Sequence, residues 1–137
     1  MRTMTGIIFS DLGRASAFMA LDWVQAALRD ALGFNCFPAT LNLRPKGEQD
    51  ARLWEAVRTE STGVALPSPE GGYCSARLYP VEIHTGGSRP DDKIKGAVLL
   101  PDVSGYPKDK IEIIAPVRLK DAYGVQDGDA LTLEFVH

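Results

Sequence analysis

Short stretches in which hydrophobic and polar residues alternate recur along the chain, and this period of two predicts β-strands. Five such regions are bounded by turn residues, namely 6–9, 40–43, 74–84, 94–100 together with 111–115, and 131–136. The segments 67–72 and 86–92 are rich in glycine and proline and are expected at hairpin ends. Because strands dominate, we expect a mainly β domain of the α+β class, with a closed or nearly closed barrel that removes strand edges.

A period of 3.6 residues marks two helices. The main helix is predicted over residues 22–32, with Asp22 as its N-cap and Gly33 as its left-handed C-cap. Its apolar stripe, which should pack on the sheet, consists of Leu21, Val24, Leu28 and Leu32. A short helix is predicted over residues 51–58 with Asp50 as its cap. Its apolar side is formed by Leu53, Trp54 and Val57, and the aromatic residue is expected in the core.

The segment Ala39-Thr40-Leu41-Asn42-Leu43 brings a hydroxyl and an amide together. In an extended chain, Thr40 and Asn42 point to one face, whereas Leu41 and Leu43 point to the other. Neutral oxygen donors of this kind suit a magnesium ion that keeps some waters and takes its negative ligands from substrate phosphates. The simpler alternative is a strand whose polar residues merely face water.

One carboxylate, that of Glu112, lies in the otherwise apolar run Ile111-Glu112-Ile113-Ile114. A buried carboxylate needs partners that offset the cost of its desolvation. If Glu112 faces an apolar cleft beside Ser104 and Tyr106, it can accept hydrogen bonds from a heterocycle or from ligand hydroxyl groups. The alternative is an edge strand in which Glu112 faces water.

Two loops combine charged residues with glycine. The segment 10–16 offers an arginine, hydroxyl groups and backbone N–H groups to phosphate oxygens, but its single glycine is also typical of an ordinary turn. Asp127-Gly128 precedes an alternating apolar run and predicts a tight turn into the last strand. We therefore assign Asp127 and Asp129 to the structure of that turn.

Composition and charge exclude several classes of function. With 137 residues, 45% of them hydrophobic, the sequence is expected to form one domain over residues 1–137. Its net charge of −3 lacks the positive surplus that non-specific nucleic-acid binding requires. Two distant cysteines and two separated histidines give no disulfide or zinc pattern. Because no apolar run has the roughly 20 residues of a membrane span and the first residues lack a secretory core, we expect a cytoplasmic protein.

In their order and spacing, these segments resemble the archaeal CTP-dependent riboflavin kinase family over residues 6–135. The resemblance rests on Leu32-Gly33-Phe34 followed by Thr40-Leu41-Asn42-Leu43, on Gly96-Ala97-Val98 with Pro101, on Ile111-Glu112-Ile113-Ile114-Ala115-Pro116, and on Asp127-Gly128-Asp129. The Thr-Leu-Asn and Glu-Ile-Ile-Ala-Pro elements are the specific parts. The resemblance implies a six-stranded cradle-loop β-barrel with one main helix and one short helix.

The resemblance also implies an activity, the transfer of the terminal phosphoryl group of CTP to riboflavin, which gives FMN and CDP. Carried over position by position, Thr40 and Asn42 would hold Mg²⁺, and Ser104 and Glu112 would contact the flavin. The nucleotide would be contacted by two segments, the first formed by Asp11, Leu12, Gly13, Arg14, Ala15 and Ser16 and the second by Val117, Arg118, Leu119 and Lys120. Candidates for a role in the chemistry itself are Glu112 and Arg118. The protein is expected to be a monomer or a small homo-oligomer.

The first nucleotide segment departs from the family pattern. Where family members show Gly-Leu-Gly-Glu-Gly, this chain has Asp11-Leu12-Gly13-Arg14-Ala15, so two glycines are absent and a carboxylate lies near the expected phosphates. An unpaired charge within ~5 Å of a polyphosphate costs on the order of 1–3 kcal/mol. Two alternatives therefore stay open, a non-catalytic flavin- or nucleotide-binding module on the same scaffold and a small-barrel interaction protein.

Overall fold

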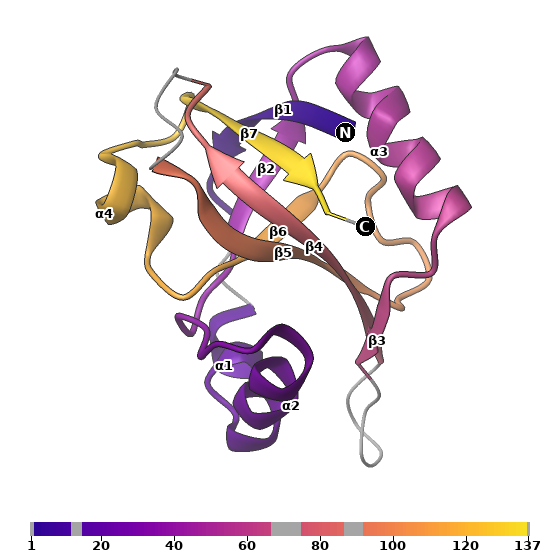
Figure 1. Ribbon diagram of the computed structural model, residues 1–137. Helices are drawn as coiled ribbons and strands as arrows, with labels where there is room; N and C mark the ends of the chain where they lie inside the picture. The colour runs from indigo at the N-terminus through magenta and orange to yellow at the C-terminus, as the bar shows by residue number, and fades with distance from the viewer. Residues whose placement is uncertain (1, 12–14, 67–74, 87–91, 137) are drawn as a thin grey trace.

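The computed structural model describes residues 2–11, 15–66, 75–86 and 92–136, which form seven strands and four helices (Figure 1). In chain order the elements are β1 (Arg2–Phe9), α1 (Ala15–Met19), α2 (Asp22–Leu32), β2 (Leu41–Pro45), α3 (Glu48–Glu60), β3 (Val64–Leu66), β4 (Ala76–His84), β5 (Ile94–Pro101), β6 (Ile111–Ile114), α4 (Leu119–Tyr123) and β7 (Ala130–Phe135). None of these helices combines the length and the apolar character that crossing a membrane would require.

Six of the strands close into an antiparallel barrel in the order β4-β5-β6-β2-β1-β7, and β7 pairs back onto β4. The closing ladder sets Val81 opposite Phe135 and His84 opposite Thr132. The seventh strand, β3, pairs with the start of β4 and lies outside the closed ring. The predicted mainly β fold with a closed six-stranded barrel is confirmed, and the closure leaves these six strands without a free edge.

Alternation along the strands fills the barrel with apolar side chains. In β7, for example, Leu131, Leu133 and Phe135 are buried in the inner cluster. Trp54 of α3 packs onto this cluster, with its ring stacked on that of Phe135 at a centroid distance of 5.9 Å. Trp54 is only 1% exposed, so its predicted place in the core is confirmed.

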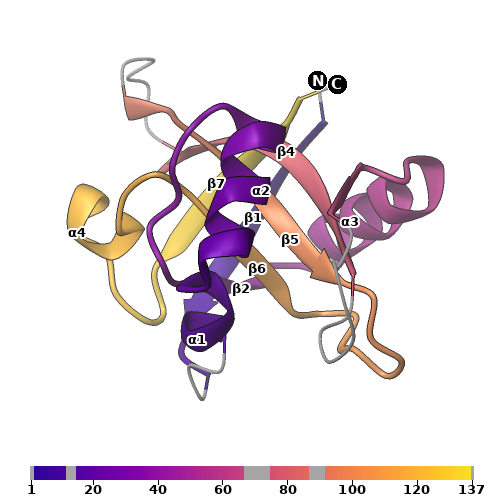
Figure 2. The ribbon, with the colours of Figure 1, turned by 90° about the horizontal axis from the view of Figure 1, so that it is seen from below.

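A second apolar cluster lies where α2 crosses the outside of the barrel (Figure 2). Val24 and Leu28 of α2 are fully buried there, together with Leu78 of β4 and Leu99 of β5. The predicted packing of the α2 stripe on the sheet is therefore confirmed. The two large helices lie on different sides of the barrel, with α3 against β1 and α2 near β3.

Gly96 of β5 lies where neighbouring strands approach closely. A Cβ atom at this position would be 2.4 Å from the carbonyl oxygen of Ile114 and 2.8 Å from Cδ1 of Ile83. Both distances are far shorter than van der Waals contact. Glycine is thus required at position 96, the first residue of the Gly96-Ala97-Val98 element, because β5 packs so closely against β4 and β6.

The helices begin at other residues than predicted. α2 covers the predicted range and Gly33 has the left-handed conformation at φ 84°, but the N-cap is Leu21 and Asp22 is the first helical residue. α3 runs from Glu48 to Glu60 with Gly47 as its N-cap, so at 13 residues the helix predicted to be short is longer than α2, which has 11. The carboxylate of Asp50 accepts backbone N–H groups from Gly47 at 3.1 Å and from Thr5 at 2.8 Å. The prediction of Asp22 and Asp50 as N-cap residues is wrong, since Leu21 and Gly47 occupy those positions. Asp50 lies in the first turn of α3 instead, where its carboxylate still caps the helix start through Gly47 and also ties it to β1.

The sequence patterns did not predict the short elements of the fold. Four helices are present among the described residues where two were predicted, and the added α1 and α4 have five residues each. The three-residue strand β3 was also not predicted. β1 begins at Arg2, four residues earlier than expected, because residues from Arg2 onward pair with β7. β2 begins at Leu41, so Thr40 lies directly before it.

Some sequence predictions fall on residues outside the described part of the chain. These include the hairpin segment 67–72, most of the segment 86–92, and Cys74. Within the described part, Cys36 is buried, and desolvation raises the pKa of its thiol to about 11. Cys36 is thus part of the apolar cluster beneath α2.

Candidate functional site

A cavity of about 570 Å³ is lined by segments that lie far apart in the sequence. Its walls come from the end of β1, the start of β2, the connection that follows β5, strand β6 and the start of α4. Phe18 and Phe37 add an apolar wall. The volume falls in the range of about 300–1,000 Å³ that is usual for small-molecule sites. The barrel thus brings together residues of four segments that the sequence analysis singled out, namely 10–16, 39–43, 111–114 and 117–120.

Thr40 and Asn42 both line this cavity. Asn42 lies opposite Glu112 in the ladder between β2 and β6, so the two side chains share one face of the sheet. The Thr40 hydroxyl donates a hydrogen bond to Oε1 of Glu112 at 3.1 Å. Leu43, by contrast, is fully buried in the inner cluster. Leu41 packs against that cluster but also lines the cavity, so the alternation expected for this segment is present only in part. The polar groups of Thr40, Asn42 and Glu112 nevertheless lie side by side.

The side-chain oxygen of Asn42 is buried and has no hydrogen-bond partner. A buried acceptor without a partner costs about 1–3 kcal/mol, so such a group calls for a functional explanation. A metal ion or a ligand donor at this oxygen would remove that cost. No group of three or more His, Cys, Asp or Glu residues in the described part of the chain could hold a metal. The oxygens that could face an ion here are the neutral ones of Thr40 and Asn42 and the neighbouring carboxylate of Glu112, all of them hard donors of the kind that Mg²⁺ accepts.

Glu112 is only 6% exposed and lines the same cavity. Its Oε2 atom accepts a short hydrogen bond from the hydroxyl of Tyr106. Burial raises the pKa of Tyr106 strongly, and the hydrogen bond to Glu112 and its charge raise it further, so the phenol stays a donor. The alternative of an edge strand with Glu112 in water is wrong, because β6 is paired on both sides, with β5 and with β2.

Two lysines line the cavity and are each fixed by an aspartate. Lys110 pairs with Asp11 at 2.5 Å, and Lys120 of α4 pairs with Asp127 at 3.0 Å. The Asp127 carboxylate also accepts a hydrogen bond from the Ser10 hydroxyl at 2.5 Å. An ammonium group has three N–H donors, so each lysine retains donors for an anionic ligand. Asp127 thus belongs to the turn, as predicted, and also connects the turn to two residues of the cavity wall.

Only some of the residues predicted to contact a nucleotide are found to line this cavity. Asp11 lines the cavity, and so do all four residues of the second segment, which are Val117, Arg118, Leu119 and Lys120. The residues Leu12, Gly13 and Arg14 lie outside the described residues. Ala15 and Ser16 form the start of α1, and nothing can be said of their side chains. The roles of these residues stay predictions.

Ser104, predicted to contact a flavin, occupies an exposed turn between β5 and β6 and is not among the residues that line the cavity. Tyr106, two residues later, does line it. Sequence reasoning missed Lys110 as a cavity residue, because its partner Asp11 is 99 positions away in the chain. No local pattern around Lys110 indicates this pairing.

Comparison with known proteins gives one family match. The chain matches a family model described as CTP-dep_RFKase, domain of unknown function DUF120, over residues 8–135. The matched range includes every residue of the cavity named above.

Several curated relatives carry the name riboflavin kinase. One from Pyrobaculum arsenaticum is 29% identical, over 96% of this chain and 59% of the relative. Another, from Archaeoglobus fulgidus, is 33% identical, over 96% of this chain and 53% of the relative. A third, from Aeropyrum pernix, is 34% identical, over 90% of this chain and 88% of the relative. The chain therefore spans less than two thirds of the first two relatives and most of the third.

Proposed function

The chain belongs to the CTP-dep_RFKase family, and from this premise we propose that it is a riboflavin kinase. It transfers the terminal phosphoryl group of CTP to riboflavin and releases FMN and CDP. The observation that carries the proposal is the unpartnered, buried oxygen of Asn42 beside Thr40 and Glu112. This cluster lines a cavity that two lysines and an arginine also line, as a site for a charged, metal-bound phosphate chain requires.

Phosphoryl transfer makes limited demands on the protein. The transition state is loose, so the rate depends on alignment of the reactants and on neutralising charge on the phosphate oxygens. Thr40 and Asn42 are the residues that would hold Mg²⁺, which when bound supplies positive charge to those oxygens. Lys110, Lys120 and Arg118 offer further positive charge from the cavity wall.

The Asp11 carboxylate, one of the changes in the phosphate loop, is compatible with this role. Asp11 introduces a carboxylate near the expected phosphates, but the ammonium group of Lys110 lies 2.5 Å from it. This ion pair offsets the repulsion that an unpaired carboxylate would exert on a polyphosphate. Lys110 therefore supports nucleotide binding by neutralising the Asp11 carboxylate, although less of its own charge is then left for the phosphates.

Glu112 is the residue that would position riboflavin. A carboxylate has about four acceptor sites, and the hydroxyls of Thr40 and Tyr106 occupy two of them. The remaining sites can accept a hydrogen bond from a substrate hydroxyl or from the flavin ring. We assign Glu112 to this contact, and we assign no residue to the role of general base.

The proposal is tested by incubating the protein with riboflavin, Mg²⁺ and each nucleoside triphosphate in turn, followed by chromatography of the flavins. We expect FMN to form fastest with CTP and to require the metal. Formation of FMN with ATP alone would preserve the kinase and overturn the choice of donor. No FMN with any donor would contradict the proposed activity.

Binding measurements separate the remaining alternatives if no FMN forms. A ligand at 100 times its dissociation constant stabilises a fold by ~2.7 kcal/mol, which a thermal unfolding curve detects. Stabilisation by riboflavin or by a nucleotide without turnover would indicate a non-catalytic binding module. No stabilisation by either would favour an interaction protein.

A further inference from the structure

A second cavity, of about 420 Å³, lies between α3, the start of β4 and the connection that follows β5. Its lining includes the cationic residues Arg58, Arg77 and Lys108. Asp102 is the acidic residue in the lining, and its carboxylate is already engaged by the Ser75 hydroxyl at 2.8 Å and by Arg77 at 3.5 Å. The wall is therefore cationic, in a chain whose net charge is −3.

The two guanidinium groups carry unused donors. The Nε atoms of Arg58 and Arg77 are buried and have no hydrogen-bond partner. Arg58 forms an ion pair with Glu55 through a terminal nitrogen, so Nε stays unpaired, and its guanidinium lies 5.5 Å from the ring centroid of Trp54. Arg77 approaches Asp102 through Nε, but the contact does not have hydrogen-bond geometry. The Arg58 N–H has no acceptor, and the Arg77 N–H faces only the poorly aligned Asp102 carboxylate at 3.5 Å. Buried donors left in this way are costly, and an anion that offers acceptors would remove part of the cost.

We propose that this second cavity binds a small anion of the phosphate class, held by Arg58, Arg77 and Lys108. Guanidinium groups match the oxygens of a phosphate in geometry and charge, and an ammonium group adds a point charge. The anion could be free phosphate or the phosphoryl end of a nucleotide, because both present the same oxygens.

The proposed anion site is separate from the candidate active site. Tyr106 and Val103 line both cavities, so the connection between β5 and β6 forms a shared wall. Neither arginine lines the first cavity. The proposal therefore does not depend on the kinase activity and is tested without it.

The test is calorimetric titration of the whole chain with inorganic phosphate at constant ionic strength. We expect saturable binding, with a Kd that rises about tenfold or more in Arg58→Gln and in Arg77→Gln, since each removes a charge-assisted hydrogen bond. Arg52→Gln is the matched control, because Arg52 lies on the same helix, is paired with Glu48 in solvent and does not line the cavity. Arg77→Lys serves as a second variant in case a glutamine variant fails to fold. It keeps the positive charge but removes the Nε donor, so it should also weaken phosphate binding.

Three results would overturn the proposal. The first is the absence of saturable phosphate binding, and the second is equal affinity for phosphate in the wild type and in both glutamine variants. The third is loss of phosphate binding in Lys120→Gln, which would place the anion in the first cavity.

A parallel titration with CMP identifies the source of the anion. Tighter binding of CMP than of phosphate, lost in the same arginine variants, would indicate a nucleotide, and equal or weaker binding would indicate free phosphate.

Discussion

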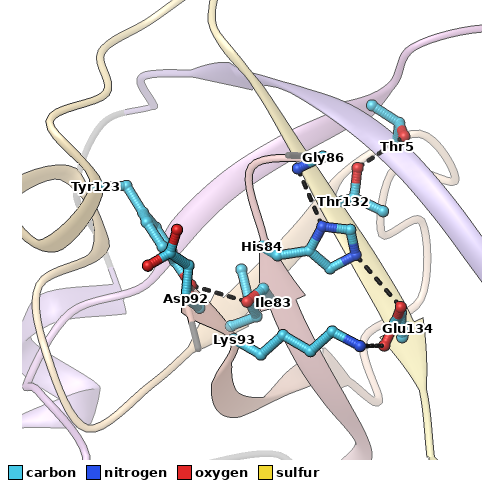
Figure 3. A network of polar contacts seen from close by, with 9 residues as sticks. All are labelled: Thr5, Ile83, His84, Gly86, Asp92, Lys93, Tyr123, Thr132 and Glu134. Carbon is cyan, nitrogen blue, oxygen red and sulfur yellow. Dashed lines mark hydrogen bonds and ion pairs between the residues drawn. The ribbon is translucent and has the colours of Figure 1, made fainter. Parts of the chain in front are cut away.

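Two glutamates occupy apolar strands with the same local pattern but have different partners. Glu112 follows Ile111 in β6, and Glu134 follows Leu133 in β7. Glu134 accepts a hydrogen bond from the ammonium group of Lys93 at 2.9 Å and lies 3.4 Å from Nε2 of His84 (Figure 3). Glu112 instead accepts hydrogen bonds from the neutral hydroxyls of Thr40 and Tyr106.

The surroundings of the two carboxylates differ as well. Around Glu134, most polar groups have partners, with Thr5 and Thr132 joined at 3.0 Å and the Gly86 N–H donated to Nδ1 of His84 at 3.0 Å (Figure 3). Nε2 of His84 is the exception, because it is buried and makes no hydrogen bond, although the Glu134 carboxylate lies 3.4 Å away. None of these residues lines either of the two cavities. Around Glu112, the neighbouring oxygen of Asn42 has no partner, and a cavity of about 570 Å³ adjoins it.

The difference shows what distinguishes a structural carboxylate from a candidate functional one. The hydrogen bond from Lys93 lowers the pKa of Glu134 and raises that of Lys93, so the two charges stabilise each other on the outer face of the barrel. Hydroxyl donors orient Glu112 without cancelling its charge. An anion held in this way can still interact with a ligand in the cavity.

Glutamine substitutions at the two sites give the largest contrast. In Glu112→Gln, we expect kcat/KM for FMN formation to fall about a hundredfold, because a charged acceptor for the substrate is lost. In Glu134→Gln, kcat/KM should change by less than about twofold, because the side chain is outside the cavity. Steady-state kinetics with riboflavin and CTP measures both, and similar losses in the two variants would refute the distinction.

Two tyrosine variants test the difference between the two carboxylate sites through single hydrogen bonds. Tyr106→Phe removes the donor to Glu112 and should lower kcat/KM about tenfold, as expected for one such bond in a site. Tyr123→Phe removes a hydroxyl that contacts the carbonyl oxygens of Ile83, at 2.8 Å, and of Asp92. This change should lower the free energy of unfolding by about 1 kcal/mol without affecting kcat/KM. Urea unfolding and kinetics on both variants are required. An unchanged kcat/KM in Tyr106→Phe would show that Glu112 needs no orientation by this hydroxyl.

The smallest expected effect is in the pH dependence of stability. The pKa of Glu134 is lowered from its ordinary value of 4.5 by Lys93 and His84, so the folded state binds its proton less tightly than the unfolded state. Its stabilising contribution is therefore present above about pH 4.5 and is lost as the pH falls through the lower, folded-state value. Glu134→Gln should flatten this part of the curve of unfolding free energy against pH. A curve with unchanged slope would mean that the ion pair contributes nothing to stability.

The sequence predicted those features that depend on local patterns. Alternation identified the barrel strands, and the stripe containing Val24 and Leu28 identified α2 with its C-cap at Gly33. The alternation expected over residues 40–43 led to Thr40, directly before β2, and to Asn42 within it, and both line one cavity. These inferences succeed because a period of two or of 3.6 residues determines which side chains share a face.

Other features depend on contacts between distant segments and could not be predicted. The pairs formed by Lys110 with Asp11 and by Lys120 with Asp127 arise only when the barrel closes. The patterns around Glu112 and Glu134 are alike, so the sequence cannot tell which one has a cationic partner. Elements as short as β3 and α4 carry too few residues to show a period. The contact of Ser104 with a flavin, the single domain over residues 1–137 and the oligomeric state stay predictions.

The most direct test of the proposed site is the magnesium dependence of FMN formation in Asn42→Ala. The wild-type protein should respond to Mg²⁺ in a saturable manner with riboflavin and CTP present. The variant should lose this turnover while still quenching riboflavin fluorescence, because Asn42 is assigned to the metal and not to the flavin. Asn35→Ala is the control, since Asn35 is exposed and contacts only Arg29 among the hydrogen bonds described. Turnover retained in Asn42→Ala, at wild-type magnesium dependence, would contradict the account.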